Sequence, residues 1–319
     1  MLKKYLSEVS YQAVFIAYNF LPINVWKILS NPAAEILAFF NNYQIHKNIK
    51  YLTVNNYNLQ LDIYQSLAPK PQPTVIFIHG GGWVGRPREV ELFFLLPYLK
   101  IGFSVVNVGY RLAAQSLAPA AVADCRCALD WVMRNAQQYN FDPEKIILSG
   151  FSAGGHLAMT TALLTPDVGF DSFCEGDEEL NVAAIVNWYG VTDVKDLLEG
   201  ANVHDYALEW MGNQSDRLEI GERVSPINYV HSQLPPIFTV HGDADLSVPY
   251  NHAVRFHEAL NQANVPNQLL TIPGGGHGEF SYSENLNIYE NIESFLRKYD
   301  LFNCKDSAIS SQLTAINNE

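Results

Sequence analysis

The sequence predicts one α/β domain built on a mostly parallel sheet, and three observations support this fold class. The chain has 319 residues, of which 48% are hydrophobic, so it can bury one large core. Short apolar runs with few polar breaks recur along it, which is typical of strands buried on both faces. Segments with helical periodicity separate these runs, and this repetition gives parallel strands with helices on both faces of the sheet.

The predicted elements begin with a hairpin at residues 49–54 and 58–64, where polarity alternates and a short Asn-rich turn joins the two strands. Helical periodicity is clearest at residues 120–138 and 251–263. The segment at about residues 195–235 breaks the rhythm and is predicted to be an inserted cap. The buried strands after the hairpin are predicted at residues 75–78, 105–108, 146–148, 184–188, 237–240 and 269–272.

The two ends of the chain differ in character from the central domain predicted at residues 48–302. Residues 1–47 are apolar and aromatic, but Pro22 and several polar residues make them too broken for a transmembrane helix. Glu8 and the lack of a cleavage site argue against a signal peptide. We expect a helical lid there, with contact to a membrane surface as the alternative. Residues 303–319 are polar and small and are predicted to be a disordered tail.

Charge and cysteine content limit the partners and the compartment. The formal net charge is -13, and no stretch gathers Lys and Arg into a basic stripe, so nucleic acid is excluded as a partner. Cys125, Cys127, Cys174 and Cys304 have neither zinc-site spacing nor the density of a disulfide scaffold. We therefore expect a reduced, cytoplasmic chain in which Cys125 and Cys127 fill the core. Histidine and cysteine spacing also gives no metal site.

The motif Gly-Phe-Ser-Ala-Gly at residues 150–154 is the central chemical signal. It follows the predicted strand at 146–148 and precedes a helical run at 156–164. A serine nucleophile must stand clear of the backbone on such a turn, and small residues two positions away let strand and helix approach. The amide end of the helix also faces developing negative charge. Ser152 is the predicted nucleophile, and a plain glycine-rich turn is the alternative.

A glycine-rich loop, His-Gly-Gly-Gly-Trp at residues 79–83, follows another predicted strand. Acyl transfer passes through an oxyanion that needs preorganised N–H donors. We predict that the amides of Gly81, Gly82 and Ala153 form the oxyanion hole and that His79 holds the loop by a hydrogen bond. A phosphate-binding loop is excluded because no Lys-Ser or Lys-Thr follows and the spacing is not GxGxxG.

The general base is sought among nine histidines, of which two compete. His277 lies among glycines after the last predicted strand, where a loop can bring the imidazole back over the serine. His241 lies at a strand end, in His-Gly-Asp-Ala-Asp, and is interpreted as a packing or loop-holding residue. We therefore predict His277 as the base.

The third member is a carboxylate between serine and histidine in chain order, which orients the imidazole and stabilises its cation. Asp245 is favoured because it stands where the loop leaves for the next helix. Asp243 is expected to accept backbone amides in the turn. Asp193 is a weaker candidate, interpreted as a turn or helix-cap residue.

With these four motifs in order, the chain resembles the α/β-hydrolase carboxylesterases related to hormone-sensitive lipase over residues 49–302. Among them it is most similar to the small bacterial-type esterases that include feruloyl and acetyl-xylan esterases. The resemblance implies an eight-stranded, mostly parallel sheet and acyl-enzyme chemistry without a cofactor. It also implies a small-molecule ester substrate and a pocket roofed by inserted segments.

The expected activity is serine carboxylic ester hydrolysis of short-chain or aryl esters. An apolar substrate pocket could be lined by aromatic residues near the motif ends, and core packing is the alternative for each. Two other functions stay open: a serine amidase or peptidase of the formylkynurenine formamidase or prolyl-oligopeptidase type, and a non-catalytic ligand-binding member of the fold. The aromatic residues named for the pocket are Trp83, Phe151, Trp188 and Tyr189.

Overall fold

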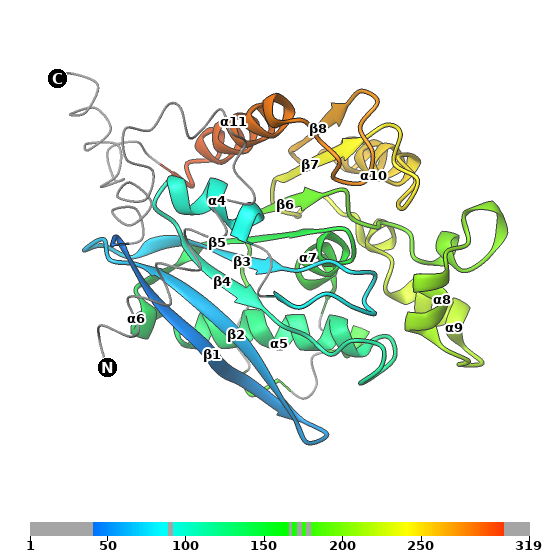
Figure 1. Ribbon diagram of the computed structural model, residues 1–319, viewed down its shortest axis with the longest axis horizontal. Helices are drawn as coiled ribbons and strands as arrows, with labels where there is room; N and C mark the ends of the chain where they lie inside the picture. Colours follow the sequence, from blue (N-terminus) through cyan, green and yellow to red (C-terminus); the bar gives the residue numbers. More distant parts are fainter. Residues whose placement is uncertain (1–40, 89–91, 166–167, 171–173, 177–179, 303–319) are drawn as a thin grey trace.

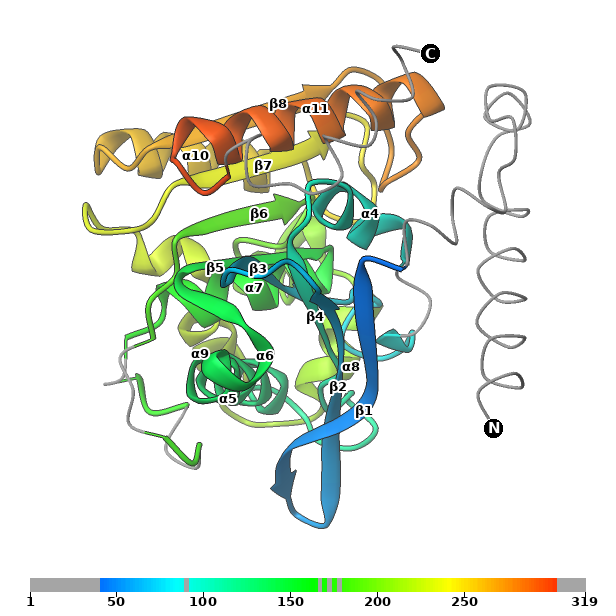
Figure 2. The same ribbon diagram turned by 90° about the vertical axis from the view of Figure 1, so that its left-hand side faces the viewer.

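The structure is a computed structural model that describes residues 41–88, 92–165, 168–170, 174–176 and 180–302. Within this part an eight-stranded sheet carries helices on both faces (Figures 1 and 2). The strand order is β1-β2-β4-β3-β5-β6-β7-β8. The expected eight-stranded, mostly parallel sheet is thus confirmed.

The strands correspond to the eight predicted segments, with differences at their ends. The β1–β2 and β2–β4 pairs are antiparallel, and every later pair is parallel. Their bounds are β1 Tyr43–Val54, β2 Tyr57–Ser66, β3 Gln72–Ile78, β4 Ser104–Val108, β5 Phe141–Phe151, β6 Ala184–Trp188, β7 Ile237–Gly242 and β8 Asn267–Ile272.

Strand β1 begins before the predicted hairpin, inside the N-terminal extension predicted at residues 1–47. Its pairing register with β2 shifts between His46 and Ile49, and Asn48 there has a φ of 57°. Such a bulge inserts unpaired residues and changes which side chains share a face. The alternation of polar and apolar residues that marks a strand is therefore interrupted at this point. For this reason the sequence pattern does not predict the first part of β1.

The apolar runs of β3 to β7 are buried as predicted, because the sheet separates two hydrophobic clusters. The prediction is wrong for the run at residues 269–272, because β8 lies at the edge of the sheet and only Ile272 in it is buried. Ile76 and Ile78 of β3 belong to one cluster, and Val75 and Phe77 belong to the other. Successive side chains of a strand point to opposite faces, so a strand covered on both sides must be apolar throughout. This is the physical basis of the unbroken apolar runs.

Helices cover each face of the sheet (Figure 2). Side chains of α4 and α11 enter the cluster that contains Val75, and side chains of α5 and α7 enter the cluster that contains Ile76. Helix α5 ends four residues before its predicted end at residue 138. The helix bounds are α4 Leu92–Lys100, α5 Ala120–Arg134, α6 Ala136–Tyr139, α7 Ala153–Leu163, α8 Asp205–Met211, α9 Arg217–Arg223, α10 Asn251–Gln262 and α11 Tyr282–Lys298.

The predicted insertion lies between β6 and β7. It contains α8, α9 and the short 3-10 helices Lys195–Leu197, Gly200–Asn202 and Pro226–Tyr229. Figure 1 shows α8 and α9 on the side toward which the parallel strands point. Trp210 of α8 is fully buried in the same core cluster as Ile76 and Ile78 of β3. The insertion therefore packs against the domain, and its role as a cap stays a prediction.

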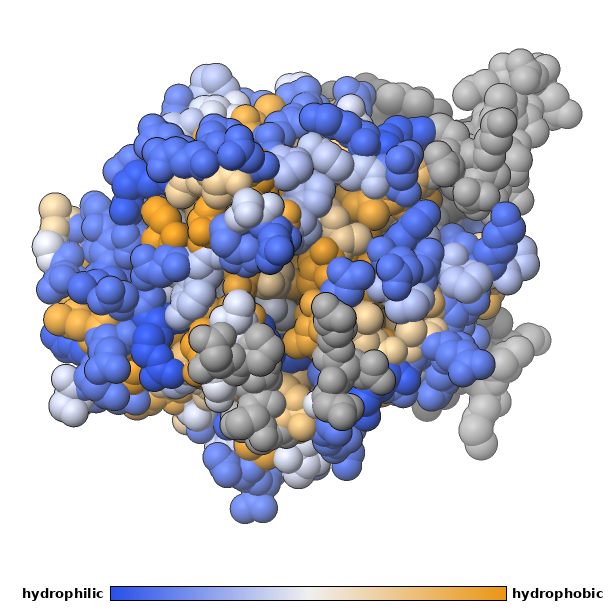
Figure 3. All heavy atoms as spheres, turned by 180° about the vertical axis from the view of Figure 1, so that it is seen from behind, coloured by the Kyte–Doolittle hydropathy of each residue, from blue (hydrophilic) through white to orange (hydrophobic). Residues whose placement is uncertain are grey.

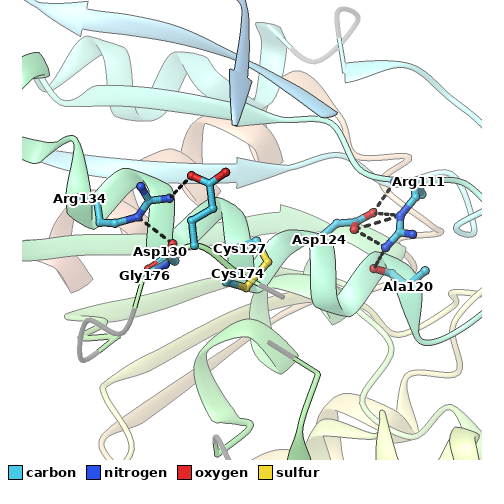
Figure 4. Close-up of a disulfide and its surroundings, with 9 residues drawn as sticks. Arg111, Ala120, Asp124, Cys127, Asp130, Arg134, Cys174 and Gly176 are labelled. Atoms are coloured by element: carbon cyan, nitrogen blue, oxygen red, sulfur yellow. Dashed lines mark hydrogen bonds and ion pairs between the residues drawn. A yellow bond between two sulfur atoms is a disulfide. The ribbon is translucent and has the colours of Figure 1, made fainter. Parts of the chain in front are cut away.

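One cysteine prediction is wrong. Cys127 of α5 forms a disulfide with Cys174, with their Cα atoms 4.9 Å apart (Figure 4). The 47-residue separation explains why local cysteine spacing gave no sign of this bond. The same short segment is held by Asp130 of α5, which accepts the amide of Gly176 at 3.2 Å. Cys125 is free and buried, as expected of a core residue.

Several predictions concern the surface and the ends of the chain. The face seen in Figure 3 is largely hydrophilic, with smaller apolar areas between the polar ones. Within the described ranges, no helix is long and apolar enough to cross a membrane. Most of the proposed lid at residues 1–47 and the whole tail at 303–319 lie outside the described residues.

Candidate active site

Three side chains that are far apart in the sequence meet at the carboxyl edge of the parallel strands. Ser152 follows β5, Asp245 follows β7 and His277 follows β8. The Nε2 atom of His277 is 2.8 Å from Oγ of Ser152, and its Nδ1 atom is 2.7 Å from Oδ2 of Asp245. Parallel strands end on the same edge of a sheet, so this topology brings together all three predicted residues.

The serine lies in a sharp turn between β5 and α7. Its φ is 55° and its ψ is -123°, a region that residues other than glycine rarely occupy. The Ser152 amide donates to the Trp188 carbonyl at 2.9 Å. A Cβ atom on Gly154 would lie 2.1 Å from the Ile78 carbonyl oxygen. Only glycine at residue 154 therefore lets α7 start this close to β3.

The carboxylate of Asp245 is held by several donors. Its Oδ1 atom accepts the amides of Ser247 at 2.8 Å and Val248 at 2.9 Å, and Oδ2 faces His277. Burial pushes the pKa of Asp245 upward, but hydrogen bonds from His241, His277 and the Val248 amide outweigh it and hold the pKa well below its usual range. Asp245 is consequently ionised at neutral pH.

The two competing acids have other partners. Asp243 accepts the amide of Gly274 at 2.6 Å, as expected of a residue that satisfies the turn. Asp193 pairs with Arg255 at 2.9 Å and accepts the Asp196 amide at 3.2 Å. The turn interpretation of both residues is thus confirmed.

The glycine loop after β3 leaves backbone donors near the serine. Gly81 has a φ of 107° and Gly82 a φ of 61°, and the carbonyl of Gly81 closes the loop by accepting the amides of Val84 and Gly85. Within the described part of the chain, the amides of Gly81, Gly82 and Ala153 have no hydrogen-bond acceptor. They remain available as donors, and their role as an oxyanion hole stays a prediction.

His79 is buried beneath this loop. Its Nδ1 atom donates to the Gly80 carbonyl at 2.9 Å, and its ring stacks on Tyr110 with centroids 4.3 Å apart. The Tyr110 hydroxyl donates to the His79 carbonyl at 3.0 Å. Burial lowers the pKa of His79 to about 4, so the ring is neutral at pH 7. The predicted hydrogen bond from His79 to its own loop is present.

Sequence reasoning missed a connection through His156. This residue received only a structural interpretation, but its Nδ1 atom accepts the Trp83 indole N–H at 3.2 Å and its Nε2 atom donates to the Val224 carbonyl at 2.7 Å. Trp83 also stacks on Trp210 with centroids 4.1 Å apart. The glycine loop, α7 and the insertion are thus joined, and no sequence signal pairs residues this far apart.

The four residues named for the substrate pocket are all buried. Trp83 and Trp188 are 0% exposed, which supports the core-packing alternative for both. Phe151 and Tyr189 are 5% and 2% exposed. The Tyr189 ring packs edge-on against His277 with centroids 4.7 Å apart, so it borders the predicted general base. A pocket role for Phe151 and Tyr189 stays a prediction. The part of the chain that the structure describes holds no group of three potential metal ligands.

The chain matches the BD-FAE family over residues 61–260. Esterase LipQ of Mycobacterium tuberculosis is 31% identical over 215 residues, which cover 64% of this chain and 50% of LipQ. Esterase LipC of the same organism is 30% identical over 226 residues, which cover 68% of this chain and 56% of LipC. The chain thus spans about half the length of these relatives.

Solved structures of esterases have the same fold. A truncated carbohydrate esterase from gut microbiota is 27% identical, with a TM-score of 0.67, and the match covers 80% of this chain and 97% of that one. Esterase Est2 of Thermogutta terrifontis is 26% identical, with a TM-score of 0.66, and the match covers 82% and 94%. This chain therefore belongs to the BD-FAE family and has the α/β-hydrolase fold of these esterases.

Proposed function

We propose that the protein is a serine carboxylic ester hydrolase in which Ser152 is the nucleophile, His277 the general base and Asp245 the orienting acid. The observation that carries this proposal is the chain of contacts from Asp245 through His277 to Ser152, at 2.7 and 2.8 Å. The named esterases among the relatives support the same chemistry. A scaffolding or ligand-binding function would require neither this alignment nor the positive φ of the serine.

In the proposed cycle, Oγ of Ser152 attacks the acyl carbonyl while Nε2 of His277 takes its proton. The Asp245 carboxylate stabilises the imidazolium that forms. His277 then returns the proton to the leaving alcohol, which breaks the ester C–O bond and leaves an acyl-enzyme. A water molecule activated by His277 hydrolyses this ester and frees Ser152.

The negative charge that develops on the carbonyl oxygen needs donors in place before the reaction. The amides of Gly81, Gly82 and Ala153 supply them in this proposal, and Ala153 is also the first residue of α7, whose amide end favours an anion. The loop carrying Gly81 and Gly82 is held by the His79 and Trp83 contacts. Its donors are therefore preorganised by the fold.

Short acyl chains are the proposed substrates. Est2 of Thermogutta terrifontis has been solved with propionate and with butyrate bound, and these matches are each 26% identical to this chain. Tyr206 of the insertion approaches the glycine loop so closely that a Cβ atom on Gly82 would lie 2.8 Å from its Cβ atom. The side chain of Tyr206 thus limits the space beside the proposed oxyanion hole, which favours small substrates.

The test is the initial hydrolysis rate on p-nitrophenyl esters from acetate to laurate, with methyl ferulate and N-formylkynurenine beside them. The wild type should be fastest on short chains, and Ser152→Ala should lower kcat by about four to six orders of magnitude. Exposed Ser232 provides the control, since Ser232→Ala should keep full activity. Ser152-dependent cleavage of only the formamide would identify an amidase instead, and Ser152-independent rates would reject the proposed nucleophile.

We also propose that the chain works in an oxidising compartment rather than in the cytoplasm that its cysteine content first suggested. The support is the bond between Cys127 and Cys174, because such bonds persist mainly outside the reducing cytosol. The test is to count the free thiols of the protein. The cells are lysed in an alkylating agent and the protein is isolated without reductant. Alkylation of both Cys127 and Cys174 would contradict the oxidising compartment and favour the cytoplasm.

A further inference from the structure

A second imidazole reaches the carboxylate of Asp245. The Nε2 atom of His241 lies 3.2 Å from Oδ2 of Asp245, the same oxygen that faces Nδ1 of His277 at 2.7 Å. It also lies 3.0 Å from the Val248 carbonyl oxygen. A carbonyl oxygen only accepts, so the proton of His241 is on Nε2, where it donates to Val248 and lies within reach of Oδ2 of Asp245.

The other side of the His241 ring has no hydrogen-bonding partner. The residue is fully buried, and its Nδ1 atom makes no hydrogen bond to any described residue. The Tyr250 ring packs edge-on against it, with centroids 5.7 Å apart. A proton added to Nδ1 would be a buried donor without an acceptor, which is unfavourable. The geometry thus places the ring proton on Nε2.

We propose that His241 is a positioning residue of the reaction centre, whose Nε2–H donates to Asp245 and draws part of the carboxylate charge away from His277. This inference rests on the proposed function, because it assigns a role within that reaction. It goes beyond packing and beyond holding the loop through Val248, because the same nitrogen also lies 3.2 Å from Oδ2 of Asp245. Among the residues that the structure describes, the titratable groups in contact with His241 are Asp245 and Tyr250, and His277 is reached through Asp245.

Loss of the His241 donor should make His277 easier to protonate. Oδ1 of Asp245 accepts the amides of Ser247 and Val248, and Oδ2 faces both imidazoles, at 2.7 Å from His277 and 3.2 Å from His241. Without the His241 donor, more of the charge falls on the bond to His277, which stabilises the protonated imidazole. Protonated His277 cannot act as a base, so the acidic limb of the activity profile should move to higher pH.

Two substitutions distinguish a role of His241 as a hydrogen-bond donor from a role in packing alone. His241→Gln keeps an N–H near the position of Nε2, whereas His241→Met has a similar length and no donor. We expect kcat/KM of His241→Met, measured on p-nitrophenyl butyrate from pH 4.5 to 9, to fall roughly tenfold at pH 7. Its acidic limb should shift upward by about half a pH unit to one unit, while His241→Gln should stay near the wild-type limb. An unshifted limb in His241→Met, or equal shifts in both variants, would overturn the proposal.

A second measurement needs neither a folded variant nor turnover. The ring nitrogens of His241 in wild-type protein labelled with 15N-histidine report where the proton lies. The proposal requires the Nε2–H tautomer between pH 6 and 8, and a proton on Nδ1 would contradict it. If the wild type shows no Ser152-dependent hydrolysis, the proposed function fails, and the tautomer still tests separately whether His241 carries on Nε2 the proton that the proposal gives to Asp245.

Discussion

Ser152 has a backbone conformation that a serine adopts only when the residues around it enforce it. Its φ of 55° costs on the order of 1–3 kcal/mol in general, and the structure holds it between β5 and α7. Gly154 helps to hold this conformation, because the Ile78 and His79 carbonyls lie where a side chain at residue 154 would be. The conformation of the serine is therefore a property of the turn as a whole.

Gly154→Ala should destabilise the protein and nearly abolish esterase activity. The added Cβ would meet the Ile78 oxygen at 2.1 Å and the His79 oxygen at 2.5 Å, and backbone atoms can yield only by moving β3 or α7. We expect a loss of about 2–4 kcal/mol in urea unfolding, within the range of severe core changes. Gly85→Ala is the matched control, since no atom lies within 4 Å of its added Cβ. Equal stability of the two variants would contradict this account.

The buried histidines predict how stability depends on pH. Burial lowers the pKa of His79 and of His156 from 6.5 to about 4. The unfolded chain therefore binds more protons than the folded chain between these values, and the free energy of unfolding should fall as pH drops from about 6.5 to 4.

His156→Gln removes one of these groups and should give a shallower fall over the same range. Urea unfolding of wild type and variant at several pH values measures both slopes, whatever the absolute stability of the variant. Parallel slopes would show that His156 does not contribute this proton uptake.

At the scale of elements, the sequence predicted what periodicity and burial determine and missed what depends on irregular geometry. The buried strands β3 to β7 were found as apolar runs because both of their faces are covered. The edge strand β8 was found as an apolar run too, although only Ile272 in it is buried. The beginning of β1 was missed because the bulge at Asn48 shifts its register. The bond between Cys127 and Cys174 was missed because packing, not spacing, brings α5 beside that segment.

That disulfide predicts a testable contribution to stability. It closes a loop between residues 47 apart, and disulfides that close such loops typically contribute about 2–4 kcal/mol by restricting the unfolded chain. Cys174→Ser should lower the free energy of unfolding by an amount of this order, and reductant should lower that of the wild type only. A wild type whose unfolding midpoint is unchanged by reductant would contradict the prediction.

For the whole molecule, the order of the motifs was enough to predict which residues meet. Successive parallel strands end on one edge, so residues after β5, β7 and β8 converge without any signal beyond their position after a strand. His241 shows the limit of this reasoning. Its place at the end of β7 suggested a packing or loop-holding residue, and its bond to the Val248 carbonyl confirms that it holds the loop. Only the atomic distances put its Nε2 beside Asp245 as well.

The central claim is that Ser152 forms a covalent acyl-enzyme, and mass spectrometry after reaction with a fluorophosphonate probe tests it most directly. The account predicts one adduct per chain on the peptide that contains Ser152, no adduct in Ser152→Ala, and wild-type labelling in Ser232→Ala. An adduct on another residue, or labelling that persists in Ser152→Ala, would contradict the claim.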